Sequence, residues 1–540
     1  MRMIPKKINV KNTVWKCYSM TDVFVALVLV IIIFLVVNAG SWILAILLLL
    51  ASVVLFMPTP DGVFYSYLFS IIKFLFGKKK FVRTLDVRTT GVRTNVGANT
   101  RGTIEGLLGI SAIKDNGVLV YRNGYFGKVL RIGQKNYYIE DEETQNADVE
   151  CFADALKMLD GAQAADLVKL DRPINFDQFS KEYFDQLQAL RAMEHTPAIE
   201  RKIELLKDRI GTIDSLNNLE KEYASEYYLV LYDRSEAELE RLAVNVHMEI
   251  SRCGLGVREL NARETAVFYR YSFSRNFDER EVADIARENL LDWALPKEVT
   301  FGTNKYKIDG VEASVFAIAD YPLYVYNAWG ARVFNIPNTK VVLHISPEEK
   351  NKAIRRIDRV IGEMQTKLLT SERASESSAA DSHRETMEVL LEALQRGNES
   401  LLNVTLTVTA YNYLGDADYR RSVRRELTIN NFKVSTLYGL QQNAFAMSGL
   451  TPTAKLKNYT TGINSSSLAA VFPFVRTICM DNGGFLLGTN YDSGYPFILN
   501  IWKRDALHQN SNAMVIGLPG SGKSYFLKTL ALNEWANETK

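Results

Sequence analysis

The sequence has few of the residues that build disulfide networks and metal centres. It contains four cysteines and five histidines in 540 residues. Cys17, Cys151, Cys253 and Cys479 lie far apart with no C-x-x-C pair, and the histidines show no metal-ligand spacing. We therefore expect reduced, inert thiols, as in cytoplasmic proteins. His344, inside the apolar run KVVLHIS, is expected to be a hydrogen-bonded core residue.

The sequence also lacks a large excess of charge. The formal net charge is +2, but residues 1–93 hold twelve Lys or Arg against three Asp, which leaves −7 on residues 94–540. The nearly neutral charge of residues 94–540 gives no general basis for tight binding of a nucleic-acid duplex, for which a basic stripe is expected. The length is typical of three or four domains of roughly 150 residues each.

Long hydrophobic runs are found near the N-terminus. Val23–Val37 and Trp42–Met57 are uncharged and are separated by the polar turn Asn38–Ser41. Each run is slightly shorter than the roughly 20 residues that cross a bilayer, and together they predict a two-helix transmembrane hairpin. Lysines and arginines flank both outer ends of the pair, so the positive-inside rule places the N-terminus and the bulk of the chain in the cytoplasm. The expected location is the cytoplasmic membrane, with the lipid bilayer as a partner.

An aromatic segment follows the hairpin. Val63–Gly77 precedes the basic run Lys78–Lys80. We expect this segment to lie along the membrane interface, with the lysines near anionic lipid; the alternative is a buried helix of the next domain. Residues 1–84 are therefore predicted to form a membrane hairpin with a basic interfacial segment.

Residues 85–445 predict a mixed α/β domain. Asn123-Gly124 is a strong turn dipeptide between two β-rich runs. Glu226–Asp233 reads as a strand, and the capping box of Ser235 and Glu238 predicts a helix directly after it. One face of that helix is apolar and is expected to be core; its residues are Leu239, Leu242, Ala243, Val246 and Ile250.

A second strand–helix unit suggests two related halves. The strand TKVVLHI is followed by Ser346, the expected N-cap of a helix. Leu402–Thr409 alternates apolar and polar residues, which predicts a half-buried strand. The charged stretch Lys181–Lys221 predicts an exposed arm or helical hairpin, and Ser371–Ser382 a mobile joint. No catalytic constellation is apparent in this domain.

The strongest functional signal lies near the end of the sequence, where GLPGSGKS matches the nucleotide-binding pattern G-x-x-x-x-G-K-[ST]. Glycines allow the backbone N–H groups to approach phosphates closely. The lysine of the pattern reaches the β/γ oxygens, and the Ser hydroxyl can hold Mg²⁺. The predicted ATP-binding residues are Gly517, Leu518, Pro519, Gly520, Ser521, Gly522, Lys523 and Ser524, with Ser524 also the metal ligand.

The flanking sequence fits this motif. Ala513–Ile516 is an apolar run typical of a buried parallel strand, and a helix is expected to begin near Lys523 with its N-terminus directed at the phosphates. Phe472–Trp502 predicts strands around NYDSG. Residues 446–540 are therefore expected to begin a P-loop (RecA-like) domain that binds ATP and Mg²⁺.

Several segments resemble one family, the TraE/TrbE-type conjugative-transfer ATPases of type IV secretion systems. They are NSSSLAAVFPF, NGGFLLGTNYDSGYPFILNIW and NSNAMVIGLPGSGKS, in that order, together with YYLVLY and LLEALQRGNESLLNVTLTVTAY. The first eighty residues resemble PrgI-type small membrane proteins. The resemblance implies an ATPase subunit that powers channel assembly or DNA transfer. It also implies a hexamer, contacts with other secretion-channel subunits and possible transient contact with transferred DNA.

The sequence departs from that family after the P-loop. Members carry a Walker B acid, a catalytic glutamate and arginines that act across subunits, and none can be assigned here. A RecA-like domain needs more chain than follows Ser524. We therefore expect a truncated product that does not turn over ATP alone.

Two alternatives remain. A non-enzymatic membrane scaffold would dock channel subunits and leave the P-loop unused. A coupling-protein-type DNA translocase would carry its P-loop soon after the hairpin, whereas more than four hundred residues separate the two here.

Overall fold

The computed structural model describes most of the chain as two compact units. The residues outside its description are 1, 5–12, 16–17, 60–61, 84–101, 174–176, 195, 219–222, 276, 323, 371–373, 398, 454–455, 476–478, 482–483, 490–495, 505–509 and 537–540. The larger unit comprises residues 1–133, 141–170 and 226–473, and the smaller one comprises 134–140, 171–225 and 474–540. Each unit is described by itself.

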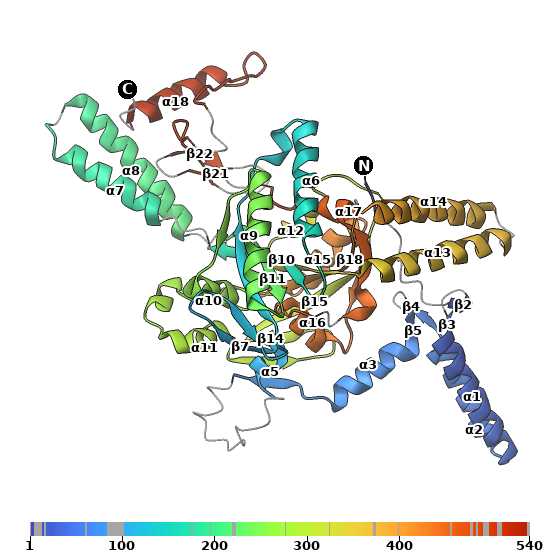
Figure 1. The fold of residues 1–540 in the computed structure, drawn as a ribbon. Coiled ribbons are helices and arrows are strands. Elements are labelled where there is room, and N and C mark those ends of the chain that lie inside the picture. Colours follow the sequence, from blue (N-terminus) through green and yellow to red (C-terminus); the bar gives the residue numbers. More distant parts are fainter. Residues whose placement is uncertain are drawn as a thin grey trace, which may run out of the picture. The chain divides into compact units, whose positions relative to one another are not determined.

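The larger unit is built on one sheet of fourteen described strands (Figure 1). The main path runs β6-β13-β14-β15-β18-β17-β10-β11-β9-β8-β7, and β12, β19 and β20 pair with β9, β15 and β18. The registered pairs of this sheet are antiparallel. The α/β composition agrees with the sequence, and the sheet is antiparallel.

The first half of the sheet has a β-hairpin followed by a ferredoxin-like β-α-β-β-α-β order. Its elements are β7 (Ile110–Ile113), β8 (Leu119–Tyr121), β9 (Phe126–Ile132), α6 (Glu142–Lys157), β10 (Ala164–Pro173), β11 (Tyr223–Asp233), α9 (Glu236–Arg252) and β12 (Val257–Glu259). A helical hairpin, α7 (Asp177–Arg191) and α8 (Pro197–Asn218), is inserted between β10 and β11. The four strands of the ferredoxin-like part lie in the order β12-β9-β11-β10.

The second half repeats this arrangement. Its elements are β13 (Glu298–Phe301), β14 (Tyr306–Ile308), β15 (Val311–Asp320), α12 (Gly330–Phe334), β17 (Thr339–Pro347), β18 (Leu401–Tyr411), α15 (Tyr419–Ile429) and β19 (Lys433–Thr436). A second helical hairpin, α13 (Lys350–Thr370) and α14 (Ala374–Arg396), is inserted between β17 and β18. The corresponding order is β19-β15-β18-β17, so the expectation of two related halves is confirmed in topology.

The two halves join through β10 and β17. These strands pair antiparallel from Ala165↔Ile345 to Lys169↔Val341, with Leu167↔Leu343 at the centre. Because each half contributes the equivalent edge strand, the sheet is related to itself by an approximate two-fold axis at this junction. A continuous antiparallel sheet is the result.

The remaining elements of the larger unit are short strands and covering helices. They are β1 (Arg2–Met3), β2 (Thr13–Trp15), β3 (Tyr18–Ser19), β4 (Pro58–Thr59), β5 (Gly62–Val63), β6 (Lys80–Val82), α5 (Ile104–Leu108), α10 (Ala262–Tyr271), η2 (Glu279–Ala283), η3 (Arg287–Asn289), α11 (Leu290–Ala294), β16 (Tyr324–Val325), α16 (Gln441–Ser448), η4 (Lys457–Tyr459), β20 (Thr461–Asn464) and α17 (Ser465–Ala469).

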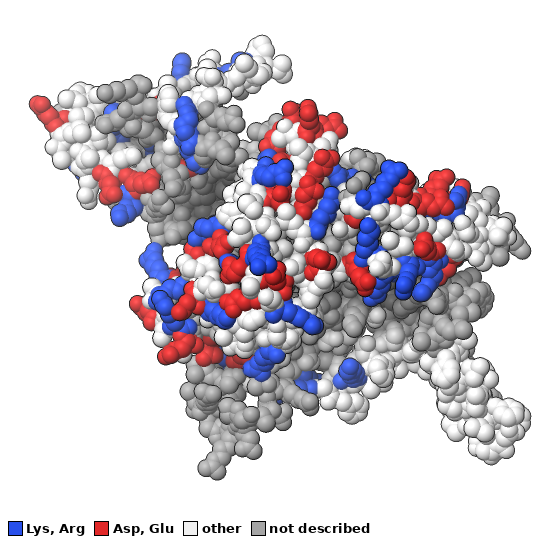
Figure 2. Space-filling view, viewed as in Figure 1, with Lys and Arg blue, Asp and Glu red and all other residues white. Residues whose placement is uncertain are grey.

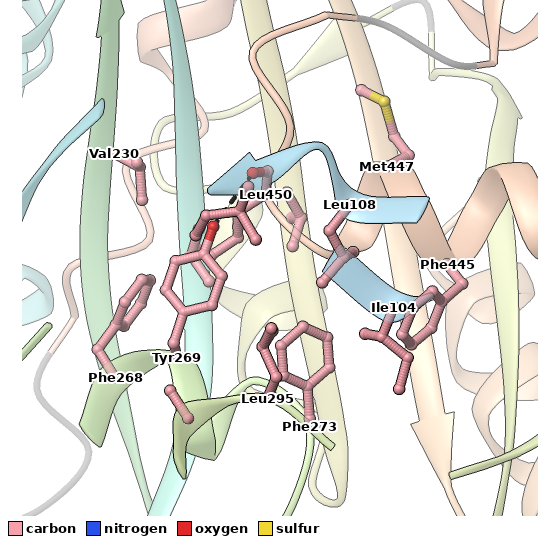
Figure 3. Close-up of a cluster of buried hydrophobic side chains, with 14 of the residues drawn as sticks. Ile104, Leu108, Val230, Phe268, Tyr269, Phe273, Leu295, Phe445, Met447 and Leu450 are labelled. Carbon is pink, nitrogen blue, oxygen red and sulfur yellow. Dashed lines mark hydrogen bonds between the residues drawn. The ribbon is translucent and has the colours of Figure 1, made fainter. Parts of the chain in front are cut away.

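The main core lies between the sheet and helices α5, α10, α11 and α16. Figure 3 shows part of it, with the hydroxyl of Tyr269 donating to the carbonyl oxygen of Leu450 at 3.3 Å. Phe445 of α16 packs edge-on against Phe301 and Tyr306 of the second half. Edge-to-face aromatic pairs of this kind add about 1 kcal/mol each to the free energy of burial.

Several local predictions are confirmed. The turn at Gly124 joins β8 to β9 with φ of +78°. Helix α9 begins after Ser235, whose hydroxyl accepts the N–H of Glu238, and the five predicted core residues of α9 are all buried. His344 is buried, with Nδ1 2.6 Å from Oδ1 of Asp166.

Two local predictions are wrong. Strand β17 continues through Pro347 and α13 begins at Lys350, so Ser346 does not cap that helix. Strand β18 is buried on both faces, because its threonines face other protein groups and not solvent. Thr405 contacts the hydroxyl of Thr460 at 2.9 Å, and Thr407 donates to Val342 O at 3.2 Å.

The predicted mobile joint is also wrong where it can be assessed. Residues 374–382 belong to α14, which packs against α13 as an antiparallel hairpin (Figure 1). Residues 371–373 lie outside the described part. The hairpin has its own apolar cluster; its members are Ala353, Ile357, Val360, Met364, Ala380, Met387, Leu390 and Leu394, with Leu401 of β18.

The N-terminal apolar runs form helices α1 (Met20–Asn38) and α2 (Trp42–Leu55), which pack together. Within the described residues, no helix combines the length and apolarity needed to cross a membrane. The predicted transmembrane hairpin and the predicted location in the cytoplasmic membrane are therefore wrong. For α2 the physical reason is its length, since its 14 residues reach about 21 Å, whereas a hydrocarbon core is about 30 Å thick.

The aromatic segment after the hairpin forms α3 (Phe64–Phe76), which packs one face on the larger unit. Tyr67 lies edge-on to Tyr438, and Phe74 is buried. The face of α3 that carries Tyr67 and Phe74 therefore agrees with the alternative prediction, a helix buried against the next domain. Phe69 and Phe76, in contrast, are exposed.

The charge distribution agrees with the nearly neutral composition. On the face drawn in Figure 2, acidic and basic side chains of the described residues are intermixed, and no extended patch of one sign is visible. This face offers no basic stripe of the kind that duplex binding needs.

The smaller unit contains the α7–α8 hairpin and the P-loop segment. Its other elements are η1 (Tyr137–Ile139), β21 (Cys479–Met480), β22 (Phe485–Thr489), β23 (Pro496–Leu499) and α18 (Lys523–Ala536). The strands form a three-stranded sheet in the order β21-β23-β22. The strands predicted within Phe472–Trp502 are thus present, and the NYDSG turn lies outside the described residues.

Candidate functional site

The P-loop precedes α18, and the helix begins at Lys523 as predicted. The N–H of Phe526 donates to Gly522 O at 2.9 Å, which closes the first helical turn. Gly520 and Gly522 have φ of +81° and +89°. Residues with a Cβ rarely adopt this conformation, so the backbone itself requires glycine at both positions.

Gly517 lies close to the side chain of Ser521 in the folded loop. A Cβ at this position would lie 2.6 Å from Oγ of Ser521, so this exposed side chain would have to rotate. The N–H of Ser521 donates to Leu518 O at 3.2 Å and closes a tight turn. Gly520 and Gly522 therefore allow the backbone to fold back on itself within a few residues.

The side chain of Lys523 lies across the loop. Its Nζ donates to Gly517 O and to Leu518 O, each at 2.7 Å. These carbonyl oxygens are neutral acceptors, and a charged phosphate oxygen is a stronger acceptor for an ammonium group. The ammonium is therefore held at the loop by contacts that an anionic ligand can replace.

The rest of the motif is open to solvent. Leu518 is 79% exposed, and Pro519, Ser521 and Ser524 are also exposed. Ser524 lies in the first turn of α18, where the helix dipole and free N–H groups favour an anion. The structure thus brings all eight predicted site residues into one continuous loop and helix start.

The strand predicted to enter this loop is absent. Ala513–Ile516 has no strand pairing, and Met514 and Ile516 are 83% and 84% exposed. A buried parallel strand needs neighbouring strands, and the described strands of this unit pair only with one another. The prediction of a buried strand at Ala513–Ile516 is therefore wrong.

Helix α18 makes contacts within the smaller unit. Trp502 Nε1 donates to Glu534 at 2.7 Å. Nζ of Lys202 on α8 lies 5.0 Å from the ring centroid of Trp535, a cation–π distance. The P-loop helix is therefore held through its C-terminal turn, away from the motif.

The charged stretch 181–221 has a structural role that sequence reasoning missed. Its helical form is confirmed, but its apolar side packs against the small sheet. The cluster comprises Tyr183, Leu187, Leu190, Ile203, Leu206, Ile210, Ile213 and Ile498, with Ile199 and Leu486 against it. Tyr183 also donates its hydroxyl to Gly484 O at 2.8 Å, and burial raises the pKa of this phenol. The helical spacing of Tyr183, Leu187 and Leu190 in the sequence could have predicted this apolar face.

The side chains of the P-loop fit the predicted Mg²⁺ and ATP in part. Among the described residues, no group of three or more His, Cys, Asp or Glu side chains is placed to hold a metal ion. Mg²⁺ commonly takes one or two protein ligands together with substrate phosphates and water. The Ser524 hydroxyl could therefore serve as a protein ligand to an ion that arrives with a nucleotide.

Comparisons with known proteins give no independent assignment. No protein-family model matches the chain, and no curated protein matches it significantly.

Proposed function

We propose that the chain binds Mg-ATP through Gly517–Ser524 as the nucleotide-binding subunit of a conjugative DNA-transfer or type IV secretion machine. The observation that carries the binding proposal is the backbone of the motif. Two glycines with positive φ lead directly into a helix that begins at Lys523. The machine is proposed from the sequence resemblance, and the hexamer, the channel subunits and the contact with DNA belong to the same proposal.

Each residue of the motif has a distinct role in this proposal. The N–H groups of the loop bind the α/β-phosphates, and Lys523 exchanges its two carbonyl acceptors for phosphate oxygens. Ser524 contributes a hydroxyl to Mg²⁺. When bound, the metal neutralises phosphate charge, and the residues of this chain orient the phosphates.

Nucleotide-dependent thermal stabilisation tests the proposal. A ligand that binds only the folded state adds RT ln(1 + [L]/Kd), about 2.7 kcal/mol at a hundred-fold excess over Kd. We expect Mg-ATP to raise the Tm of the wild-type chain. The Tm of the Lys523→Ala variant should be the same with and without Mg-ATP. Lys528→Ala, an exposed lysine of the same helix, should respond as the wild type does.

The Mg²⁺ assignment is tested separately with Ser524→Ala. This variant should keep the shift caused by ATP with EDTA and lose the additional shift caused by Mg²⁺. A wild-type chain that shows no shift with saturating Mg-ATP would contradict the binding proposal. It would favour the non-enzymatic docking subunit.

A further inference from the structure

Two cysteines that are far apart in sequence meet in the larger unit. Cys151 lies in α6, and Cys253 is the C-cap of α9, which packs against α6. The thiol of Cys151 donates to Glu249 O at 2.8 Å, and the thiol of Cys253 donates to the same oxygen at 3.7 Å. Both thiols are therefore gathered around one backbone carbonyl, within reach of each other.

The surroundings of the two thiols give them different properties. A hydrogen bond from Cys253 lowers the pKa of Cys151, and the charge of Arg252 lowers it further. Burial and the carboxylates of Glu249 and Asp148 oppose this shift, but the net direction is downward. The lowered pKa means that Cys151 loses its proton more readily than an ordinary cysteine, and on ionisation it gives up its donation to Glu249 O.

Accessibility also differs. Cys151 is half-buried, whereas Cys253 is 2% exposed. A small oxidant can reach Cys151 first, and Cys253 then lies beside the oxidised sulfur. This is the arrangement of an attacking and a resolving thiol.

We propose that Cys151 and Cys253 form a redox-reactive dithiol site that a hydroperoxide converts into an intramolecular disulfide. With hydrogen peroxide, the Cys151 thiol loses its proton and its sulfur attacks one peroxide oxygen; the O–O bond breaks, and the released hydroxide takes up that proton, so that a sulfenic acid and one water form. Sγ of Cys253 then attacks the sulfenic sulfur, the S–O bond breaks, and its thiol proton leaves with the second water. Two thiols and one hydrogen peroxide give one disulfide and two waters.

A metal site is the competing interpretation of a close thiol pair. The described residues contain no group of three or more His, Cys, Asp or Glu side chains placed to hold a metal ion, whereas structural zinc sites use four ligands. The chemistry of two thiols alone favours the disulfide. The site is independent of the proposed nucleotide function.

The test uses the full chain with Cys17→Ser and Cys479→Ser, which leaves the proposed pair as the remaining thiols. Hydrogen peroxide should remove both free thiols, give a monomeric product lighter by two hydrogens, and be reversed by dithiothreitol. Phenylarsine oxide, which bridges two close thiols with release of water, should block both thiols without oxidation.

Cys253→Ala in the same background is the matched control. It should abolish the disulfide, stop bridging by phenylarsine oxide and slow alkylation of Cys151, because the hydrogen bond that favours the thiolate is lost. If the serine background folds poorly, peptide mapping of the oxidised wild-type chain gives the same readout. Two free thiols after peroxide treatment, or a disulfide only between chains, would overturn the proposal.

Discussion

Lys340 is a buried amine with little compensation for its charge. It is 2% exposed; its Nζ donates to Ser272 O at 2.8 Å and lies 5.0 Å from the ring of Phe273. The hydroxyl of Tyr411 donates to the same carbonyl oxygen at 2.9 Å. Burial lowers the pKa of Lys340 to about 7.

This depressed pKa predicts a pH-dependent stability. Below pH about 7 the folded chain carries the full cost of the buried charge, and the unfolded lysine titrates near pH ~10.4. Because the unfolded state binds more protons between these values, the free energy of unfolding should rise over this range. Lys340→Met should remove that rise and leave stability at pH 7 unchanged or higher, since the Tyr411 hydroxyl still donates to Ser272 O. Chemical denaturation from pH 7 to 10 measures the free energy of unfolding of both chains.

Exposed Lys352→Met is the control and should keep the wild-type slope. A Lys340→Met slope equal to that of the wild type would show that other groups cause the pH dependence. Buried tyrosines such as Tyr269, whose pKa burial raises, act in the opposite direction and mainly above pH ~10.

Asp166 contacts two buried polar side chains at the junction of the two halves. Its carboxylate is fully buried, accepts the hydroxyl of Tyr232 at 2.6 Å and contacts Nδ1 of His344 at 2.6 Å. Asp166→Ala would leave two buried polar groups without this partner, and we expect a loss of about 3 kcal/mol. The shift of the denaturation midpoint measures this loss.

Asp154, exposed on α6, gives the comparison. Asp154→Ala should change stability by less than about 0.5 kcal/mol. An equal effect of the two substitutions would rule out these contacts of Asp166 as the source of stability.

At the scale of elements, glycines of the smaller unit have opposite roles. Gly522 has φ of +89°, whereas Gly211 lies inside α8 with open space at its Cβ position. Gly522→Ala should strain the P-loop by about 1 kcal/mol or more and weaken the Mg-ATP thermal shift. Gly211→Ala should instead stabilise α8 by about 0.5–1 kcal/mol.

Thermal unfolding of both variants, with and without Mg-ATP, checks these expectations. The Gly211→Ala chain should bind nucleotide as the wild type does. If Gly522→Ala were neutral in both assays, the positive-φ conformation would not be needed for the site.

At the scale of the whole molecule, the helical hairpins are insertions into a sheet that is complete without them. Strands β17 and β18 pair from Thr339↔Ala410 to Pro347↔Leu402, and the α13–α14 hairpin buries its apolar residues mainly within itself. We expect a short glycine-containing turn in place of residues 350–396 to leave the sheet folded. Stability should decrease modestly, because Leu401 loses its cover.

Circular dichroism and cooperative thermal unfolding of this shortened chain test the expectation. Ile357→Asp in the intact chain is a companion variant, since it disrupts the hairpin core alone. Loss of the sheet signal in both variants would show that the hairpin is part of the folding core.

Features that depend on neighbours along the chain could be predicted from the sequence. Capping at Ser235, the turn at Gly124 and the helix start at Lys523 are local hydrogen-bond and dihedral preferences, and all three are present. The prediction of eight P-loop residues also depends on one local pattern. Their spacing is a property of one continuous segment.

Features that depend on contacts between distant segments could not be predicted from the sequence. Burial of β18 on both faces, the exposure of Ala513–Ile516 and the two-fold arrangement of the sheet each require knowing which strands become neighbours. The meeting of Cys151 with Cys253 has the same origin. Periodicity along a chain states which face of an element is apolar, but only packing determines what covers that face.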